Sequence, residues 1–145
     1  MLVQQILKSK AKPGVLIVKS GDKVSAAAKI LAENRIGSVV VSDDGGATAS
    51  GILSERDIVR ELSRVGAPCL DQPVSAYMTT KLVTCTSQSS AQDILTQMTE
   101  GRFRHMPVVE DGRMVGLVTL GDVVKAQLSE LAMEKQALEG MIMGH

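Results

Sequence analysis

The sequence predicts a mixed α/β (α+β) protein made of two similar units, and two observations predict it. The string GILSERD at residues 51–57 returns as GLVTLGD at residues 116–122, each time followed by apolar residues at helical spacing. The similarity continues upstream, where residues of one kind recur 67 positions later: Leu31 and Met98, Arg35 and Arg102, Val41 and Val108. One supersecondary unit therefore occurs twice in the chain.

Each unit is expected to contain, in order, a strand, a helix, two strands joined by a turn, and a second helix. Apolar runs predict strands at residues 15–18, 38–41 and 49–53 of the first unit and 82–85, 105–109 and 114–118 of the second. Apolar residues at helical spacing predict helices at residues 24–34, 55–64, 90–100 and from 120 onward. The offset falls from 67 to 65 within the Gly-rich turn after residue 42, because the first copy has two extra residues there.

The two ends of the chain predict further helices. Residues 1–10 have apolar side chains at positions typical of a short amphipathic helix, which we expect to pack across the module. Residues 123–138 form one long helical pattern that includes Leu128, Leu131 and Leu138. This helix is longer than one small unit can cover, so we expect a partner surface, most simply a second copy of the chain. The predicted divisions are residues 1–66, 67–130 and 131–145.

The repeated string predicts an anion site where a strand runs into a helix. N–H groups at a helix N-terminus lack partners within the helix, and the helix dipole favours negative charge there. Ser54 and Thr119 add a hydroxyl to each junction, while Asp57 and Asp122 follow three residues later. A hydroxyl can bind phosphate, and a carboxylate can accept the two hydroxyls of a ribose. The alternative is a capping box, in which the same side chains only stabilise the helix.

With these residues in view, the chain resembles a tandem pair of CBS domains, also called a Bateman module, over residues 1–130. The string RHMPVV at residues 104–109 adds to the two signature strings. The resemblance implies two βαββα units packed through their sheets about a pseudo-two-fold axis, with two clefts between them. Members of this family bind adenosine nucleotides, and sometimes other adenosyl compounds, in those clefts. They also form dimers shaped as a flat disc of four repeats.

The resemblance also implies ligand-binding residues in each cleft. For the second cleft it implies a base near Thr80, Val83, Met106 and Pro107, with Thr119 and Asp122 at the phosphate and ribose. For the first cleft it implies a base near Val15, Ser38 and Val39, with Ser54 and Asp57 in the matching polar roles. Since Tyr77 and Phe103 are the only aromatic residues, aliphatic side chains and strand edges would have to hold the adenine.

The two copies differ in the charge that precedes the second strand of each unit. The second copy has a basic string, formed by Arg102, Arg104 and His105. In the first copy, Gly37 occupies the position of Arg104, and Ser38 that of His105. We therefore expect the second cleft to bind phosphate more tightly. The alternative is that these arginines are solvated or pair with Glu100 and Glu110. For His105 a structural hydrogen bond is favoured over a catalytic role.

Composition excludes several classes of protein. The 16 basic and 16 acidic side chains cancel, unlike the strongly basic surface of a nucleic-acid-binding protein. No apolar run reaches the roughly 20 residues that span a bilayer, and the first residues lack a signal-peptide pattern, so we expect a cytoplasmic protein without a membrane partner. Cys69 and Cys85 lack metal-ligand spacing and are expected to be free thiols, with Cys85 buried.

The pattern favours a regulator over an enzyme. Neither His105 nor His145 stands in a catalytic string with Cys or Ser, and no Gly-rich phosphate loop precedes a Lys-Ser/Thr pair. We expect a homodimer that binds an adenosine nucleotide, AMP first, with ATP, NAD or S-adenosylmethionine as other ligands. Two alternatives stay open: an accessory subunit of a separate nucleotide-metabolising enzyme, and a structural module with empty clefts.

Overall fold

The computed structural model describes residues 1–10 and 14–143, and its first sheet lies in the first repeat. Three strands pair in the order β1–β2–β3: β1 (Ile17–Val18), β2 (Ser38–Val41) and β3 (Gly51–Ser54). β1 runs parallel to β2, and β2 pairs antiparallel with β3, with Ser38 directly opposite Ser54. The expected strand at residues 15–18 is therefore shorter, and the one expected at 49–53 begins at Gly51.

The second sheet is an antiparallel hairpin of β4 (His105–Glu110) and β5 (Arg113–Thr119). The strand expected at residues 82–85 is wrong, since only Cys85 pairs there, in a single parallel bridge with Val108. The reason is that this segment leaves one sheet before it reaches the other: Thr79 is paired with Ile52 of β3. Between these two bridges, Val83 is 44% exposed.

Helices cover the sheets in both repeats. The first repeat has α2 (Val24–Asn34) and α3 (Glu55–Val65), and the second has α4 (Ala91–Gly101) and α5 (Leu120–Ile142). The N-terminal helix is α1 (Val3–Ser9), and two 3₁₀ helices, η1 (Ala67–Asp71) and η2 (Val74–Ala76), follow α3. The four long helices match their predicted ranges closely, and α5 continues without a break through residue 130.

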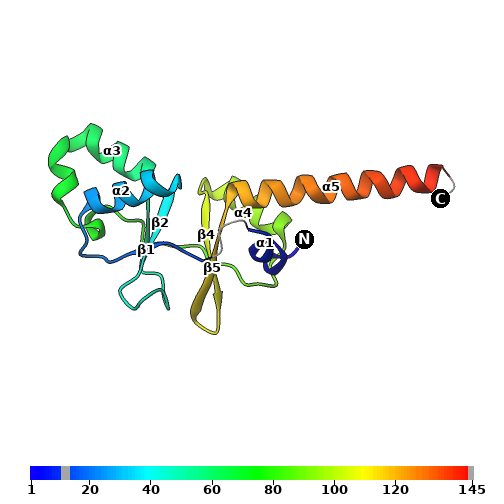
Figure 1. Cartoon of the computed structure of the whole chain (residues 1–145), viewed down its shortest axis with the longest axis horizontal. Coiled ribbons are helices and arrows are strands. Elements are labelled where there is room, and N and C mark those ends of the chain that lie inside the picture. Colours follow the sequence, from blue (N-terminus) through cyan, green and yellow to red (C-terminus); the bar gives the residue numbers. More distant parts are fainter. Residues whose placement is uncertain (11–13, 144–145) are drawn as a thin grey trace.

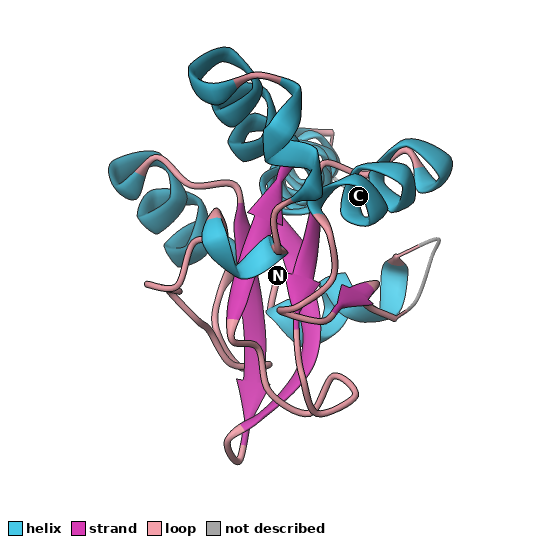
Figure 2. Cartoon of the chain, turned by 90° about the vertical axis from the view of Figure 1, so that its left-hand side faces the viewer, coloured by secondary structure: helices cyan, strands magenta, loops and turns pink. Residues whose placement is uncertain are grey.

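α2, α3 and α5 lie toward one end of the strands, and the two hairpin connections point toward the other (Figures 1 and 2). The halves stand side by side, and α5 extends well beyond them (Figure 1). Alternation along β2 turns Val39 and Val41 into the core of the first repeat, whereas Ser38 belongs to the opposite side, facing residues of the second repeat. A cavity between the repeats can therefore use side chains from both.

Two hydrophobic cores are present, and each contains a segment that precedes the other repeat. Val74 of η2 is fully buried in the first core, whereas Val3 and Ile6 of α1 are buried in the second. Both segments also bond to the start of a helix: Val24 N–H donates to Gln72 O, and Val3 N–H donates to Ser89 O. α1, expected to pack across the module, thus packs on the second core.

This exchange explains why each repeated string begins with glycine. A Cβ atom at Gly51 would lie 2.6 Å from Met78 Sδ, in the segment that covers the first sheet. A Cβ atom at Gly116 would lie 2.8 Å from Leu7 Cδ2, in the helix that covers the second sheet. Only glycine allows these covering segments to approach so closely. The two glycines therefore allow the covering segments to pack closely on the sheets, which is a structural role rather than a role in ligand binding.

Candidate ligand clefts

Each strand-to-helix junction forms a capping box, which was the alternative to an anion site. Asp57 N–H donates to Ser54 Oγ at 3.2 Å, and Ser54 N–H donates back to Asp57 Oδ2 at 2.9 Å. In the second copy, Asp122 N–H donates to Thr119 Oγ1 at 3.1 Å, and Thr119 N–H donates to Asp122 Oδ2 at 3.0 Å. These contacts begin α3 and α5.

The caps leave few backbone donors for an anion. The first N–H of α3, at Glu55, donates to Gly37 O, and the first N–H of α5, at Leu120, donates to Arg104 O. The third N–H of each helix goes to the cap hydroxyl. The second N–H of each helix, at Arg56 and Gly121, bonds neither to the cap hydroxyl nor to these carbonyls. An anion at these junctions must therefore depend largely on side-chain cations.

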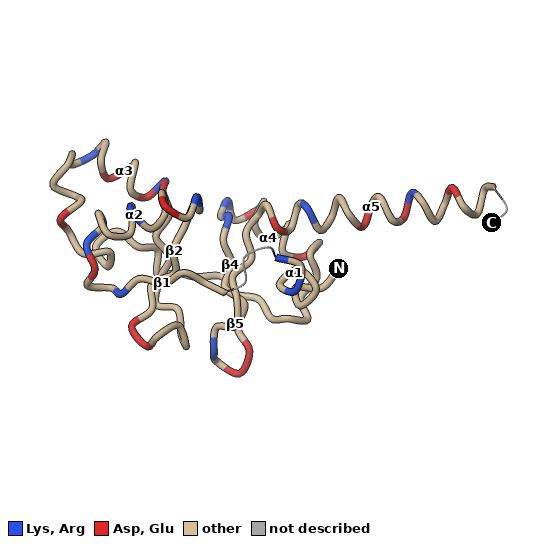
Figure 3. The backbone as a smooth tube through the Cα atoms, in the orientation of Figure 1, with Lys and Arg blue, Asp and Glu red and all other residues tan. Residues whose placement is uncertain are grey.

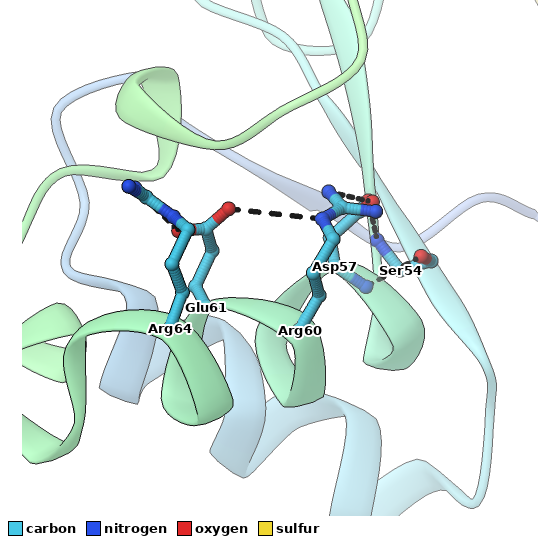
Figure 4. Close-up of polar contacts among 5 residues, drawn as sticks. All are labelled: Ser54, Asp57, Arg60, Glu61 and Arg64. Carbon is cyan, nitrogen blue, oxygen red and sulfur yellow. Dashed lines mark hydrogen bonds and ion pairs between the residues drawn. The ribbon is translucent and has the colours of Figure 1, made fainter.

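The two carboxylates have additional partners. Arg60 donates to Asp57 Oδ1 at 2.9 Å, so both oxygens of Asp57 are engaged, as Figure 4 shows. Lys10 Nζ lies 3.0 Å from Asp122 Oδ2 and also donates to Leu117 O at 2.9 Å. A ribose at Asp57 would compete with Arg60, whose side chain is 61% exposed and free to move. Asp122 keeps Oδ1 available.

One cavity between the repeats, which we call the Ser54 cleft, has a volume of about 430 Å³. Its lining includes Ser54, Arg56 and Asp57 from the first repeat and Lys81, Val83, Arg102, Arg104 and His105 from the second half. Four cationic side chains thus face one carboxylate. Such a volume is within the range of small-molecule sites, and the charge favours an anionic ligand.

A second cavity, the Thr119 cleft, has a volume of about 440 Å³ and a more apolar lining. Val15, Leu16, Ile36 and Leu117 form apolar walls, and Lys10, Ser38, His105 and Thr119 supply polar groups. Ser38 is only 5% exposed, and its hydroxyl has no hydrogen-bond partner among residues 1–10 and 14–143. A buried hydroxyl without a partner is costly, so this atom is positioned to bond to a ligand or a water molecule.

The structure brings the predicted site residues together in a crossed arrangement. Ser54 and Asp57 share a cleft with Val83 and Arg104 of the second repeat, whereas Thr119 shares a cleft with Val15 and Ser38 of the first. The resemblance implies a grouping within one repeat, whereas each of these cavities is lined by residues of both repeats. The cause is the packing of the two sheets, which sets each helix junction against the first strand region of the other half.

Five of the predicted residues line neither cleft. Met106 and Val39 have side chains fully buried in the two cores. Thr80 and Pro107 line a separate cavity of about 290 Å³ beside the second hairpin. Asp122 lies with Lys10 in a cavity under the N-terminal helix. These residues can reach a ligand in the two clefts only through backbone groups or after side chains move.

The basic string lies at the mouth of the Ser54 cleft. Arg102, in the left-handed conformation at φ 56°, ends α4, as Arg35 at φ 53° ends α2. In the described part of the chain neither Arg102 nor Arg104 belongs to an ion pair, and Glu110 instead accepts a hydrogen bond from Ser87 N–H at 2.7 Å. Figure 3 shows the positive charge where α4 passes into β4.

His105 is the residue that lines both clefts. Burial lowers the pKa of its imidazole, and the nearby Arg104 lowers it further, while Asp122 and Glu55 act in the opposite direction. The neutral ring is therefore favoured. Among residues 1–10 and 14–143, no hydrogen bond of this side chain is found, so the structural bond expected for it is absent there.

The sequence reasoning did not single out three cations of the clefts. Lys10 of the N-terminal segment lines the Thr119 cleft, and Arg56 and Lys81 line the Ser54 cleft. Arg56 lies inside the repeated string at a variable position, so only its basic character could have marked it. Lys10 follows α1, and Lys81 follows the segment that contains Val74 and Thr79. Each of these segments packs on the core of the repeat that it does not precede, and no sequence pattern reveals this packing.

The two cysteines are free thiols, as expected for both. Both are also buried, and burial was expected for Cys85. Burial, with a smaller contribution from Glu110, raises the pKa of the Cys85 thiol to about 11. Within the described ranges, no group of three or more His, Cys, Asp or Glu side chains could hold a metal ion. No helix in this part of the chain has the length and apolarity needed to cross a bilayer.

Known proteins resemble this chain along most of its length. A curated relative, the mitochondrial CBS domain-containing protein CBSX3 of Arabidopsis thaliana, is 34% identical over 98% of this chain and 72% of its own length. The crystal structure of a CBS-domain-containing protein from Agrobacterium tumefaciens is 40% identical, with a TM-score of 0.82, over 88% of this chain and 99% of that one.

Two further solved structures contain adenosyl ligands. The CBS domain protein PAE2072 from Pyrobaculum aerophilum, in complex with AMP, has a TM-score of 0.77 at 25% identity and covers 92% of this chain and 99% of its own. The CBS domain pair of MJ0100, in complex with 5-methylthioadenosine and S-adenosyl-L-methionine, has a TM-score of 0.76 at 26% identity, over 90% and 98% of the two chains. The CBS domain family model matches residues 4–64 and 74–129, so the chain belongs to the CBS domain family and carries two of these domains in tandem.

Proposed function

We propose that this chain is a regulatory module that binds adenosyl ligands in the Ser54 and Thr119 clefts. The observation that carries the proposal is the cluster of Arg56, Lys81, Arg102 and Arg104 around one cleft of ligand size, with no ion-pair partner found for the last two in the described residues. Cations gathered without acidic partners repel one another, and a bound phosphate would relieve that repulsion.

The two clefts are proposed to prefer different members of the adenosyl class. In the Ser54 cleft, a phosphate would lie among the cations and a ribose near Ser54 and Asp57, with Val83 against the base. Among the described residues, Lys10 is the one Lys or Arg that lines the Thr119 cleft, which offers the Ser38 hydroxyl between apolar walls. We therefore propose AMP for the Ser54 cleft and a less anionic adenosyl compound for the Thr119 cleft. The complexes of the two family members, one with AMP and one with 5-methylthioadenosine and S-adenosyl-L-methionine, support this range.

The test is a thermal-shift panel of adenosine, AMP, ATP, NAD and S-adenosylmethionine, followed by calorimetric titration. A ligand at about a hundred times its dissociation constant should stabilise the fold by about 2.7 kcal/mol. We expect Arg102→Ala/Arg104→Ala to weaken AMP binding at least tenfold and to reduce its salt dependence. Adenosine, which lacks phosphate, should bind both proteins alike.

Arg35→Ala is the matched control, because Arg35 ends α2 in the same backbone conformation and lines neither cleft. It should leave AMP affinity unchanged. Equal AMP affinity in wild type and in the double variant would show that the basic string has no ligand role. No shift with any adenosyl compound would favour the structural module with empty clefts.

We further propose that the chain acts by binding and without catalysis, as a cytoplasmic homodimer. Free buried thiols at Cys69 and Cys85 agree with a reducing compartment, and exposed apolar side chains on α5 support self-association. Incubation with AMP or ATP should yield no new product by chromatography. Cell fractionation tests the compartment, and copurification of an enzyme would favour the accessory-subunit alternative.

A further inference from the structure

α5 carries a regular apolar seam that begins over the body and continues along the part of the helix that extends beyond it. Val124, Leu128, Leu131, Leu138 and Ile142 are between 39% and 84% exposed. With Lys135 included, their spacing is four, three, four, three and four, which is the heptad repeat of a coiled coil. An exposed seam of this regularity on a helix of 23 residues is typical of a surface that pairs with another helix.

The seam faces away from the body of the molecule. Val123 and Ala126 are the buried residues of α5 and fix the side that packs on the second core. At about 100° per residue, the seam residues are turned by roughly 90° to 170° from the direction midway between Val123 and Ala126. A second helix can therefore lie along the whole seam without displacing the core contacts, and Figure 1 shows this side of α5 uncovered along its extension.

We propose that two copies of this chain associate through α5, with the two helices antiparallel. The proposal rests on the homodimer proposed above and names its surface and orientation. When the seams are centred on Met133, four of the five apolar residues meet another: Val124 meets Ile142, and Leu128 meets Leu138. Lys135 then lies against Leu131 of the second copy, where its stem packs and its ammonium reaches solvent.

Charge selects the antiparallel orientation. In a parallel pair, Lys135 would face its counterpart in the seam, and Glu134 would face Glu139 of the other copy, twice in each dimer. In the antiparallel pair, Lys125 lies beside Glu139 of the other copy, also twice. The one like-charge contact, between the two copies of Glu134, is flanked by Lys135 from both. Figure 3 shows that charges of both signs occur along α5.

The first experiment measures the mass of the full chain in solution by light scattering. Wild type should elute as a dimer, and Leu131→Lys/Leu138→Lys as a monomer at the same concentration. Met133→Lys is the matched control, because Met133 is 55% exposed on the opposite side of the helix and should leave the dimer intact. A monomeric wild type would overturn both the homodimer and the seam, whereas a double variant that stays dimeric would overturn only the seam.

Disulfide trapping tests the orientation. Leu128→Cys and Leu138→Cys should each fail to form a cross-linked dimer alone and should form one when the two variants are mixed and oxidised. The native Cys69 and Cys85 are buried, and wild type serves as the blank. Cross-linking of either single variant with itself would indicate parallel helices and overturn the proposal. An absence of cross-links in the mixture would do the same, since the paired residues would then not be adjacent.

Discussion

Two polar residues at the boundary between the repeats have no hydrogen-bond partner in the described part of the chain. Ser38 carries a buried hydroxyl that lines the Thr119 cleft, and His105 carries an imidazole that lines both clefts. Ser38 is matched to His105 by the repeat, so the two occupy equivalent positions. Each has a polar group that could bond to a ligand, and the buried Ser38 hydroxyl also costs stability while it has no partner.

Ser38→Ala should stabilise the protein while weakening the Thr119 cleft. Removing a buried hydroxyl that has no partner relieves a desolvation cost, so we expect the free energy of unfolding to rise by up to about 1 kcal/mol. Chemical denaturation of the ligand-free variant measures this. A loss of stability would mean that the hydroxyl already has a partner, such as a water molecule held in the cleft.

His105 should make the stability depend on pH in the mildly acidic range. Burial, followed by the charge of Arg104, lowers the pKa of His105 from its ordinary value of 6.5. The unfolded chain therefore takes up the proton at a higher pH than the folded chain does. Stability is complete above about pH 7 and is lost as the pH falls through that ordinary pKa toward the folded value.

Thermal unfolding between about pH 7 and about pH 5 compares wild type with His105→Asn. The difference in stability between the two should change over this interval, with wild type losing more as the solution becomes acidic. Parallel curves over the whole interval would contradict the assignment of the effect to His105.

At the scale of elements, the helices were predictable and the first strand of the second repeat was not. α2 through α5 have apolar spacing, and the repeated string supplied caps at Ser54 and Thr119, so local sequence was sufficient. The segment at residues 82–85 has strand-like composition, yet it joins a sheet only at Cys85. Its conformation depends on the earlier pairing of Thr79 with the first repeat, which is a tertiary contact.

The candidate site was predictable in its residues and not in their grouping. The hydroxyl residues and the basic string could be found from the repeated pattern, because each lies at a fixed place in its unit. Which junction faces which first strand depends on how the two sheets pack. For the same reason, Lys10 could not be identified, since it reaches the Thr119 cleft only because α1 packs on the second core.

The capping boxes lead to a prediction for the two carboxylates. Asp57→Ala and Asp122→Ala should each lower the free energy of unfolding by about 0.5–2 kcal/mol, because each removes a cap contact together with an ion pair to Arg60 or Lys10. Denaturant titration measures the loss. Asp→Asn at the same positions keeps an acceptor and should cost less. If alanine and wild type were equally stable, the caps would not hold these helices.

At the scale of the whole molecule, the two repeats are interlocked by their leading segments. Residues 73–79 complete the first core although they precede the second repeat, and α1 completes the second core although it precedes the first. Neither half of the sequence therefore contains a full core. The pseudo-symmetric exchange also builds both clefts from both repeats, so binding and folding of the two halves are coupled.

Fragments 1–66 and 67–145 should be poorly folded alone and should regain structure when mixed. The first fragment lacks Val74 and Met78, which pack in the core of the first repeat. The second fragment lacks Val3 and Ile6, which are buried in the core of the second repeat. Circular dichroism during melting measures this. A fragment extended to residue 79 is the control, and it should gain helical signal. A cooperative melt of either short fragment at low concentration would contradict the interlocked account.

The central claim is that an adenosyl ligand binds in clefts built jointly by the two repeats. Its most direct test is a titration of the isotopically labelled protein with AMP, followed through backbone amide signals by nuclear magnetic resonance. The account predicts that the signals of Arg56 and Asp57 shift together with those of Val83 and Arg104, all with one dissociation constant. Shifts confined to residues of a single repeat, or no shifts with AMP at saturating concentration, would contradict it.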